Sequence, residues 1–168
     1  LMGNNGPDDY LRPTYAIRIA GRDSVVQNPN PRRQVPTGYN QLNLMQKLRW
    51  RPAERWDVQY GFHYSTTSSY SRFDRLLRSR GNTLRSAEWD YGPQVWMMNH
   101  LTLAHAGSTG LYDHAALRLA HQFFEESRIE RDLNSARRMI RTEKVNAWSA
   151  NLDLEKQWRA GKHRLFYG

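Results

Sequence analysis

Apolar and polar side chains alternate most clearly in residues 41–65. In the first half, the even positions carry Leu42, Leu44, Leu48 and Trp50, and Met45 is the apolar exception among the odd positions. After a break at residues 52–55 the even positions carry Trp56, Val58, Tyr60, Phe62 and Tyr64. A period of two is typical of a β-strand with one apolar and one polar face. The pattern predicts two strands joined by a tight turn.

The same alternation recurs less cleanly elsewhere in the chain. The further segments that show it are residues 14–19, 95–103, 115–124, 148–154 and 165–167. Together with the first hairpin they give about seven strands, near the length of roughly 9–11 residues that crosses a bilayer at a tilt.

The expected connections alternate in length. Residues 21–38, 66–91 and 128–141 form long polar segments, whereas the connections at Pro52, Gly107 and Gln157 are short. Long extracellular loops and short periplasmic turns alternate in outer-membrane barrels. The chain is therefore expected to be all-β, as part of a transmembrane antiparallel up-and-down β-barrel: about seven strands of a larger barrel.

Aromatic residues stand where such strands would leave the membrane. Trp50 and Trp56 flank the first tight turn, and Tyr39, Trp89 and Tyr91 stand where long segments meet strands. Tryptophan and tyrosine gather at both membrane interfaces. The alternative is that these rings form the core of a soluble β-protein.

Residues 114–141 also allow a helix. Leu117, Ala120, Phe124, Leu133 and Ala136 stand near helical spacing, and the segment is rich in Glu, Arg and Ala. The turn at Gly110 and the strand pattern of residues 148–154 favour a strand here, because a strand hairpin continues the predicted succession of strands.

Composition and charge leave several classes of partner open. The hydrophobic share is 39%, and no apolar run approaches the roughly 18 residues of a membrane helix. The net charge of +9 suits nucleic acid, anionic lipid or an anionic ligand. Cysteine is absent, which excludes disulfides and thiolate metal sites. No nucleophile elbow, phosphate-binding glycine loop or convincing carboxylate pair points to an enzyme.

Four passages resemble the β-barrel of TonB-dependent outer-membrane receptors, particularly those of the Bacteroidetes type. They are residues 38–43 (GYNQLN), 91–98 (YGPQVWMM), 119–128 (LAHQFFEESR) and 141–154, from RTEKV to NLDL. The resemblance implies a barrel of about 22 strands closed by an N-terminal plug. Residues 1–168 would then be part of that barrel domain, cut at both ends, with the plug and the C-terminal strands absent.

The resemblance also implies a function and a location. Such receptors lie in the bacterial outer membrane and import an iron chelate (siderophore), haem or a similar nutrient by active transport energised through TonB. The expected partners are that nutrient, outer-membrane lipid, and TonB through parts not in this chain. No cofactor and no nucleic acid are expected.

The candidate ligand-binding residues are Arg72, Arg75, Trp89, His63 and Arg128. Arginines interleaved with aromatic rings suit an anionic catecholate or carboxylate chelate, through charge-assisted hydrogen bonds and stacking. The alternative for the arginine-rich segment is a solvated loop that binds lipopolysaccharide phosphates or nothing specific. The alternative for Arg128 is an ion pair at the barrel rim. The histidines show no metal-ligand spacing, so no metal site is expected.

Two other classes of function remain open. A soluble β-sheet binding module would put Leu42, Trp56 and Phe62 in one closed core. A basic nucleic-acid-binding protein would use arginines and exposed aromatic rings as a platform for single strands, but it gives no reason for loops that alternate in length.

Overall fold

The structure is a computed structural model that describes residues 10–158 and 162–168. Strands dominate it, and α1 (Phe73–Leu76) is a single helical turn. The expected all-β class is therefore confirmed. No helix in the described ranges is long and apolar enough to cross a membrane.

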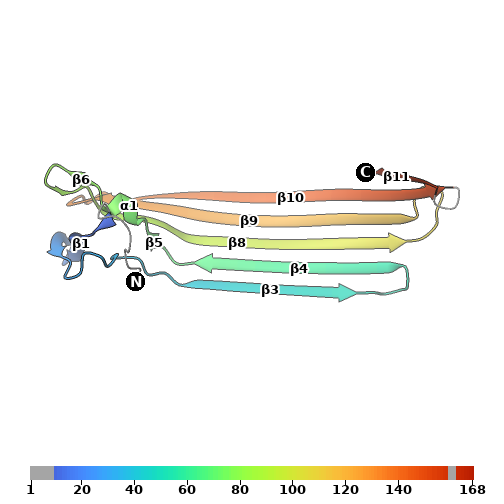
Figure 1. Cartoon of the computed structure of the whole chain (residues 1–168), viewed down its shortest axis with the longest axis horizontal. Helices are drawn as coiled ribbons and strands as arrows, with labels where there is room; N and C mark the ends of the chain where they lie inside the picture. Colours follow the sequence, from blue (N-terminus) through green and yellow to red (C-terminus); the bar gives the residue numbers. More distant parts are fainter. Residues whose placement is uncertain (1–9, 159–161) are drawn as a thin grey trace. The chain divides into compact units, whose positions relative to one another are not determined.

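The main sheet holds the longest strands. They are β3 (Gln41–Trp50), β4 (Trp56–Thr67), β8 (Ser86–Ala106), β9 (His114–Asp132), β10 (Met139–Trp158) and β11 (His163–Tyr167). They are hydrogen-bonded in the order β11-β10-β9-β8-β4-β3, and β5 (Tyr70–Ser71) pairs with β8 (Figure 1). Among the described residues, β3 and β11 are edges of this sheet, and the strands do not close into a barrel.

The chain divides into two compact units by its internal contacts. Unit 1 consists of residues 1–41, 66–95 and 125–144. Unit 2 consists of residues 42–65, 96–124 and 145–168. Strands β8, β9 and β10 contribute residues to both units, whereas the small elements between β4 and β8 belong to unit 1.

Among its described residues, unit 2 is a sheet with no buried hydrophobic side chain. Every residue of β3 is exposed, on both faces. The side chains that alternate along the strands stand on opposite faces, as a period of two requires. One face, named here the apolar face, carries the following exposed side chains: Leu42, Leu44, Leu48, Trp50, Trp56, Leu119, Trp148 and Leu152.

The N-terminal strand of unit 1 corrects one expectation. Residues 14–19 form β1 (Thr14–Ile19), as predicted, but β1 pairs with β2 (Arg22–Gln27) in a separate two-stranded sheet and not with the main sheet. Ala20 and Gly21 both have positive φ, 46° and 80°, which is the geometry of a two-residue hairpin turn. The turn reverses the chain at once, so β2 lies where a long loop was expected.

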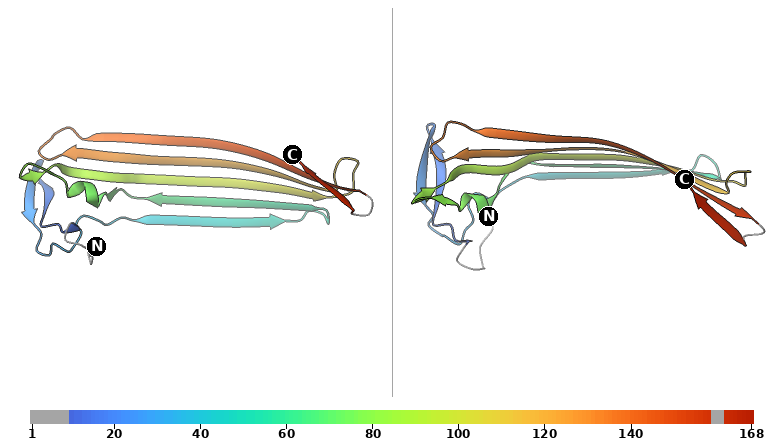
Figure 2. Two further views of the ribbon diagram at one scale, coloured as in Figure 1. Left: turned by 45° about the horizontal axis from the view of Figure 1, so that its top comes forward. Right: turned by 90° about the horizontal axis from the view of Figure 1, so that it is seen from above.

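The connection between β4 and β8 is also more ordered than the predicted loop of residues 66–91. It contains β5, α1 and a small hairpin of β6 (Ser79–Arg80) and β7 (Thr83–Leu84). Leu76 of α1 is one of the few buried hydrophobic side chains. Figure 2 shows α1 and the β1–β2 hairpin gathered near the unit 1 ends of the long strands.

The third expected loop, residues 128–141, is largely strand. Strand β9 continues to Asp132 and β10 begins at Met139, so residues 133–138 alone connect them. The predicted alternation of long and short connections is therefore wrong at this point. The helical alternative for residues 114–141 is wrong as well, because cross-strand pairing decides the conformation where propensity is weak.

Candidate functional site

Four of the five predicted ligand-binding residues meet in unit 1. The guanidinium of Arg72 lies 5.2 Å from the ring centre of Trp89 and 5.7 Å from that of Tyr91. Arg75 stands 5.6 Å from Trp89, and Arg128 stands 5.9 Å from Tyr91. These distances are within the range of cation–π attraction. We name Arg72, Arg75, Trp89, Tyr91 and Arg128 the arginine–aromatic cluster.

The local fold explains why these residues meet. Strand β5 pairs with β8 through Tyr70 opposite Tyr91, and the backbone N–H of Arg72 then donates to the carbonyl of Trp89 at 2.8 Å. The chain turns into α1 at this point, and the buried Leu76 anchors that turn. Trp89 and Tyr91 are two residues apart on one strand, so they share a face.

Carboxylates hold the arginines of the cluster in place. Asp74 accepts a hydrogen bond from Nε of Arg72 at 2.8 Å, and this bond raises the pKa of Arg72. The hydroxyl of Tyr91 accepts from Nη1 of the same arginine at 3.0 Å. Arg128 stands 3.6 Å from Glu126 and 3.7 Å from Glu143. The cluster is a preorganised set of cations over flat rings, suited to an anionic ligand with a planar or apolar body.

The fifth predicted residue, His63, lies in unit 2. Its ring stands 5.9 Å from Trp96 and 6.4 Å from His100, centre to centre. His100 in turn lies over Gly61, where an added Cβ would come within 1.9 Å of its ring. Within residues 10–158 and 162–168, no group of three or more histidine or acidic side chains is placed to hold a metal ion.

A second arrangement in unit 1 was not predicted. The carboxylate of Asp23, whose side chain is 1% exposed, accepts from Nη1 of Arg131 at 2.5 Å and from the backbone N–H of Asn134 at 2.8 Å. Arg131 is 7% exposed and also stands 3.8 Å from Glu88. Hydrogen bonding by Arg131 lowers the pKa of Asp23. These contacts attach the β1–β2 hairpin to the end of β9 and to the connection that follows it.

Arg12 is buried with incomplete hydrogen bonding. Its side chain lies over the ring of Phe73 at 5.5 Å, and its Nε and Nη1 atoms have no hydrogen-bond partner among the described residues. Burial lowers the pKa of Arg12 to about 10. Because an unpaired buried cation is unfavourable, Arg12 marks a destabilising point in unit 1.

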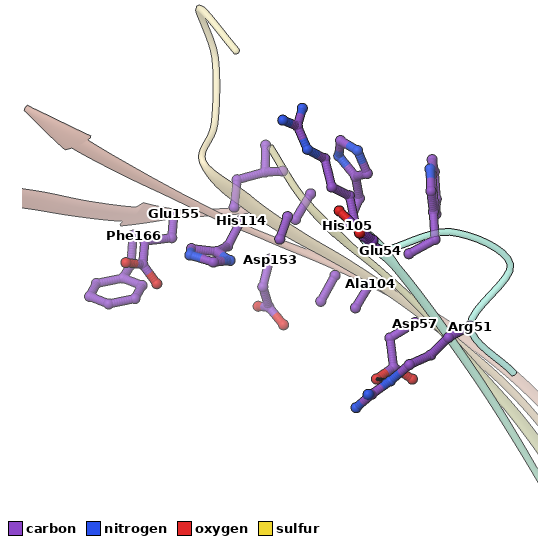
Figure 3. Close-up of a pocket in the computed structure, with 15 residues that line it drawn as sticks. Arg51, Glu54, Asp57, Ala104, His105, His114, Asp153, Glu155 and Phe166 are labelled. Atoms are coloured by element: carbon purple, nitrogen blue, oxygen red, sulfur yellow. Dashed lines mark hydrogen bonds and ion pairs between the residues drawn. The ribbon is translucent and has the colours of Figure 1, made fainter. Parts of the chain in front are cut away.

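Unit 2 carries an open hollow of about 530 Å³ at its short turns. Figure 3 shows Asp57, His114 and Asp153 projecting to one side of the ribbon and His105 to the other. Ala104, Ala106 and Ala116 also line the hollow. Three of its acids are paired: Asp57 binds Arg49, Asp153 binds Arg118, and Glu155 lies 3.1 Å from Arg164.

The sequence did not indicate the role of some residues of unit 1. Tyr91 was assigned to a membrane interface, although its spacing from Trp89 signalled a shared face. Asp23 and Arg131 gave no signal, because 108 residues separate them and both lay in segments expected to be loops.

Comparisons with known proteins identify no relative. No family model, curated protein or solved structure matches this chain.

Proposed function

We propose that this chain is part of the β-barrel of a bacterial outer-membrane receptor of the TonB-dependent type, which imports an iron chelate, haem or a similar nutrient. In this proposal, β3, β4 and the unit 2 parts of β8, β9 and β10 cross the membrane as neighbouring strands of a larger barrel. The connections in unit 1 then face the outside, and the short turns of unit 2 face the periplasm.

The observation that carries the proposal is the apolar face of unit 2. Its large side chains are exposed although hydrophobic burial is the main force that stabilises soluble folds. Trp148 is 79% exposed and stacks on His121 with ring centres 4.2 Å apart. An apolar band of alternate residues flanked by aromatic rings is what a lipid-facing barrel wall presents. A soluble monomer rarely exposes such a surface.

Polar groups on the apolar face support the same proposal. Tyr60 donates to Asn99 at 2.6 Å, and His121 lies 2.6 Å from the side-chain oxygen of Asn146. Hydrocarbon offers no hydrogen bonds, so polar side chains that face lipid must satisfy one another. On the polar face, ion pairs such as Arg49 with Asp57 instead suit a wet barrel interior.

The arginine–aromatic cluster is the proposed nutrient site. It would bind an anionic chelate through the guanidinium groups of Arg72, Arg75 and Arg128, with the Trp89 and Tyr91 rings against the ligand's body. His63 would contribute separately, from the polar face of unit 2. Transport itself would need TonB and the plug.

The first experiment measures circular dichroism and sedimentation of the chain in buffer and in nonionic detergent micelles. We expect β-structure in micelles and aggregation in buffer, because the apolar face needs a nonpolar environment. A soluble monomer that unfolds cooperatively in plain buffer would contradict the membrane assignment and favour the soluble binding module.

A matched pair of variants sharpens that experiment. Leu44 and Met45 are neighbours on β3, 52% and 65% exposed, on opposite faces. In lipid, Leu44→Arg should destabilise the sheet by about 2–4 kcal/mol, and Met45→Arg, which faces the wet interior, should have little effect. Equal tolerance of both substitutions in micelles would show that the apolar face does not meet lipid.

A further inference from the structure

A small cavity beside the arginine–aromatic cluster is lined by three arginines. It measures about 160 Å³, and its lining includes Arg75, Arg78, Arg85, Ser86 and Trp89. We name it the arginine pocket. All of its lining residues belong to unit 1, so an inference from it does not depend on the apolar face of unit 2 or on the membrane proposal.

The backbone fixes where these arginines stand. The N–H of Arg85 donates to the carbonyl of Arg78 at 2.9 Å, which closes the β6–β7 hairpin at its base. The N–H of Leu133 then donates to the carbonyl of Arg85 at 3.0 Å and ties this base to the end of β9. Ser86 is buried beside them.

The charges in the pocket are unbalanced. Glu130 and Asp132 also line it, but Glu130 lies 3.1 Å from Arg141 and Asp132 lies 3.5 Å from Arg80. Arg78 and Arg85 make no side-chain hydrogen bond or ion pair with any described residue, although each could offer several N–H donors.

Arg75 is also incompletely paired. Its Nε atom is buried and has no hydrogen-bond partner in the part of the chain that the structure describes. The nearest carboxylate oxygen, on Asp74, is 3.9 Å away, and the other oxygen of that carboxylate accepts from Arg72. Three guanidinium groups with unused donors therefore line one small cavity.

We propose that the arginine pocket binds a phosphate monoester carried on a carbohydrate or lipid headgroup. Three guanidinium forks offer more donors than a single carboxylate can accept, whereas a phosphate monoester has three strong acceptor oxygens and close to two negative charges. Arginine is favoured where such groups are recognised through paired hydrogen bonds. The Trp89 ring gives the body of the ligand a flat surface.

The probe is glucose 6-phosphate, with glucuronate as the carboxylate counterpart of similar size. Binding is measured by calorimetry on the full chain, in whichever medium circular dichroism shows it folded, so that failure of the membrane proposal leaves this test intact. We expect saturable binding of the phosphate and at least about tenfold weaker binding of glucuronate.

The decisive variant is Arg78→Gln with Arg85→Gln. It should weaken glucose 6-phosphate binding at least about tenfold. The matched control, Arg33→Gln with Arg137→Gln, removes the same charge from two exposed arginines outside the pocket and should bind as the unaltered chain does. Dichroism spectra establish that both variants keep the fold.

A second arm separates the two sources of the ligand. Phosphatidylcholine vesicles with and without phosphatidic acid are tested for co-sedimentation with the same proteins. If pocket-dependent binding occurs with phosphatidic acid and not with glucose 6-phosphate, the ligand is a lipid headgroup, and the reverse assigns a soluble sugar phosphate. Three outcomes would overturn the proposal. They are an equal loss of binding in both double variants, equal affinity for glucuronate and glucose 6-phosphate, and the absence of saturable binding to both glucose 6-phosphate and phosphatidic acid vesicles.

Discussion

The two units treat charge and hydrophobicity in opposite ways. Unit 1 buries charged side chains such as Asp23 and Arg131, whereas unit 2 exposes large apolar ones such as Leu48 and Trp148. A protein in water normally does the reverse on both counts. Unit 1 holds buried charges through specific contacts such as the pair of Asp23 and Arg131, although Arg12 and Arg75 keep unused donors. Unit 2 leaves its apolar face exposed, and under the proposed function lipid covers that face.

The largest expected effect comes from breaking the buried pair of unit 1. Asp23→Ala leaves Arg131 buried without its main partner and should lower the free energy of opening the β1–β2 hairpin by about 3 kcal/mol. Hydrogen exchange of the β1 and β2 amides measures this opening. Amides of residues 42–50 in β3 and 56–65 in β4 should be unchanged, because these residues belong to unit 2.

Protonation of Asp23 at low pH should destabilise the β1–β2 hairpin as Asp23→Ala does. The pKa of Asp23 is lowered in the folded chain, so the stabilisation it provides is present above the ordinary carboxylate range and is lost as the pH falls through the lowered value. Asp132→Ala is the control. It removes an exposed partner of Arg80 and should cost less than about 1 kcal/mol. If the two substitutions have equal effects, the burial of the Asp23 pair does not stabilise the hairpin.

The next largest expected effect is a gain in the stability of unit 1 and not a loss. Arg12→Met removes a buried guanidinium with unpaired Nε and Nη1 atoms and keeps an apolar contact with Phe73. It should stabilise unit 1 by about 2 kcal/mol, as replacement of poorly compensated buried charges often does. Hydrogen exchange in β1 and β2 is again the measurement, with the exposed Arg33→Met as a neutral control.

The pKa of Arg12 supplies an independent check on that variant. Because burial lowers this pKa to about 10, the folded chain binds fewer protons there than the unfolded chain, and stability should rise as the pH is raised through about 10. Arg12→Met should abolish this rise. A variant less stable than the unaltered chain would show that the guanidinium has a favourable partner.

The strands of unit 2 were predictable from the sequence, whereas the contacts between distant segments of unit 1 were not. A strict alternation such as that of residues 41–65 reports which face of a strand is apolar, so β3 and β4 were found at nearly their observed bounds. The β1–β2 hairpin shows the limit. Residues 22–27 lack a clear alternation, and a two-residue turn at Ala20 and Gly21 decides their conformation.

The candidate site was predictable to a similar degree. Arginines near aromatic residues in one segment indicated Arg72, Arg75 and Trp89, and these residues do meet. The pair of Asp23 and Arg131 depends on tertiary contact between distant segments. Periodicity within one strand carries no information about such a contact.

A smaller effect is expected from the apolar face of unit 2. Tyr60→Phe removes the hydrogen bond to Asn99, and in micelles this should cost about 0.6 kcal/mol, the average for side-chain hydrogen bonds in membranes. A double-mutant cycle with Asn99→Ala isolates the pair, measured by denaturant unfolding in detergent. Ser65→Ala, which removes a bond to Asn43 on the polar face, should have less effect because water can replace it. A larger loss for Ser65→Ala would reverse the assignment of the two faces.

The smallest expected effect on stability comes from a charged contact in unit 2, that of Asp113. Asp113 precedes β9 and accepts hydrogen bonds from the backbone N–H of Gln157 at 2.8 Å and from Lys156 at 3.0 Å, and these bonds lower its pKa to about 2. The contact therefore stabilises the turn above about pH 4 and is lost as the pH falls towards 2. Exchange of the Gln157 amide should quicken over that interval and should already be fast in Asp113→Asn at pH 5. Because Asp113 is partly exposed, β3 and β4 should keep their protection under acid conditions that release the Asp23 pair of unit 1. Simultaneous loss of protection in both units would show that they respond to acid as one body, and the contrast between them would not extend to stability.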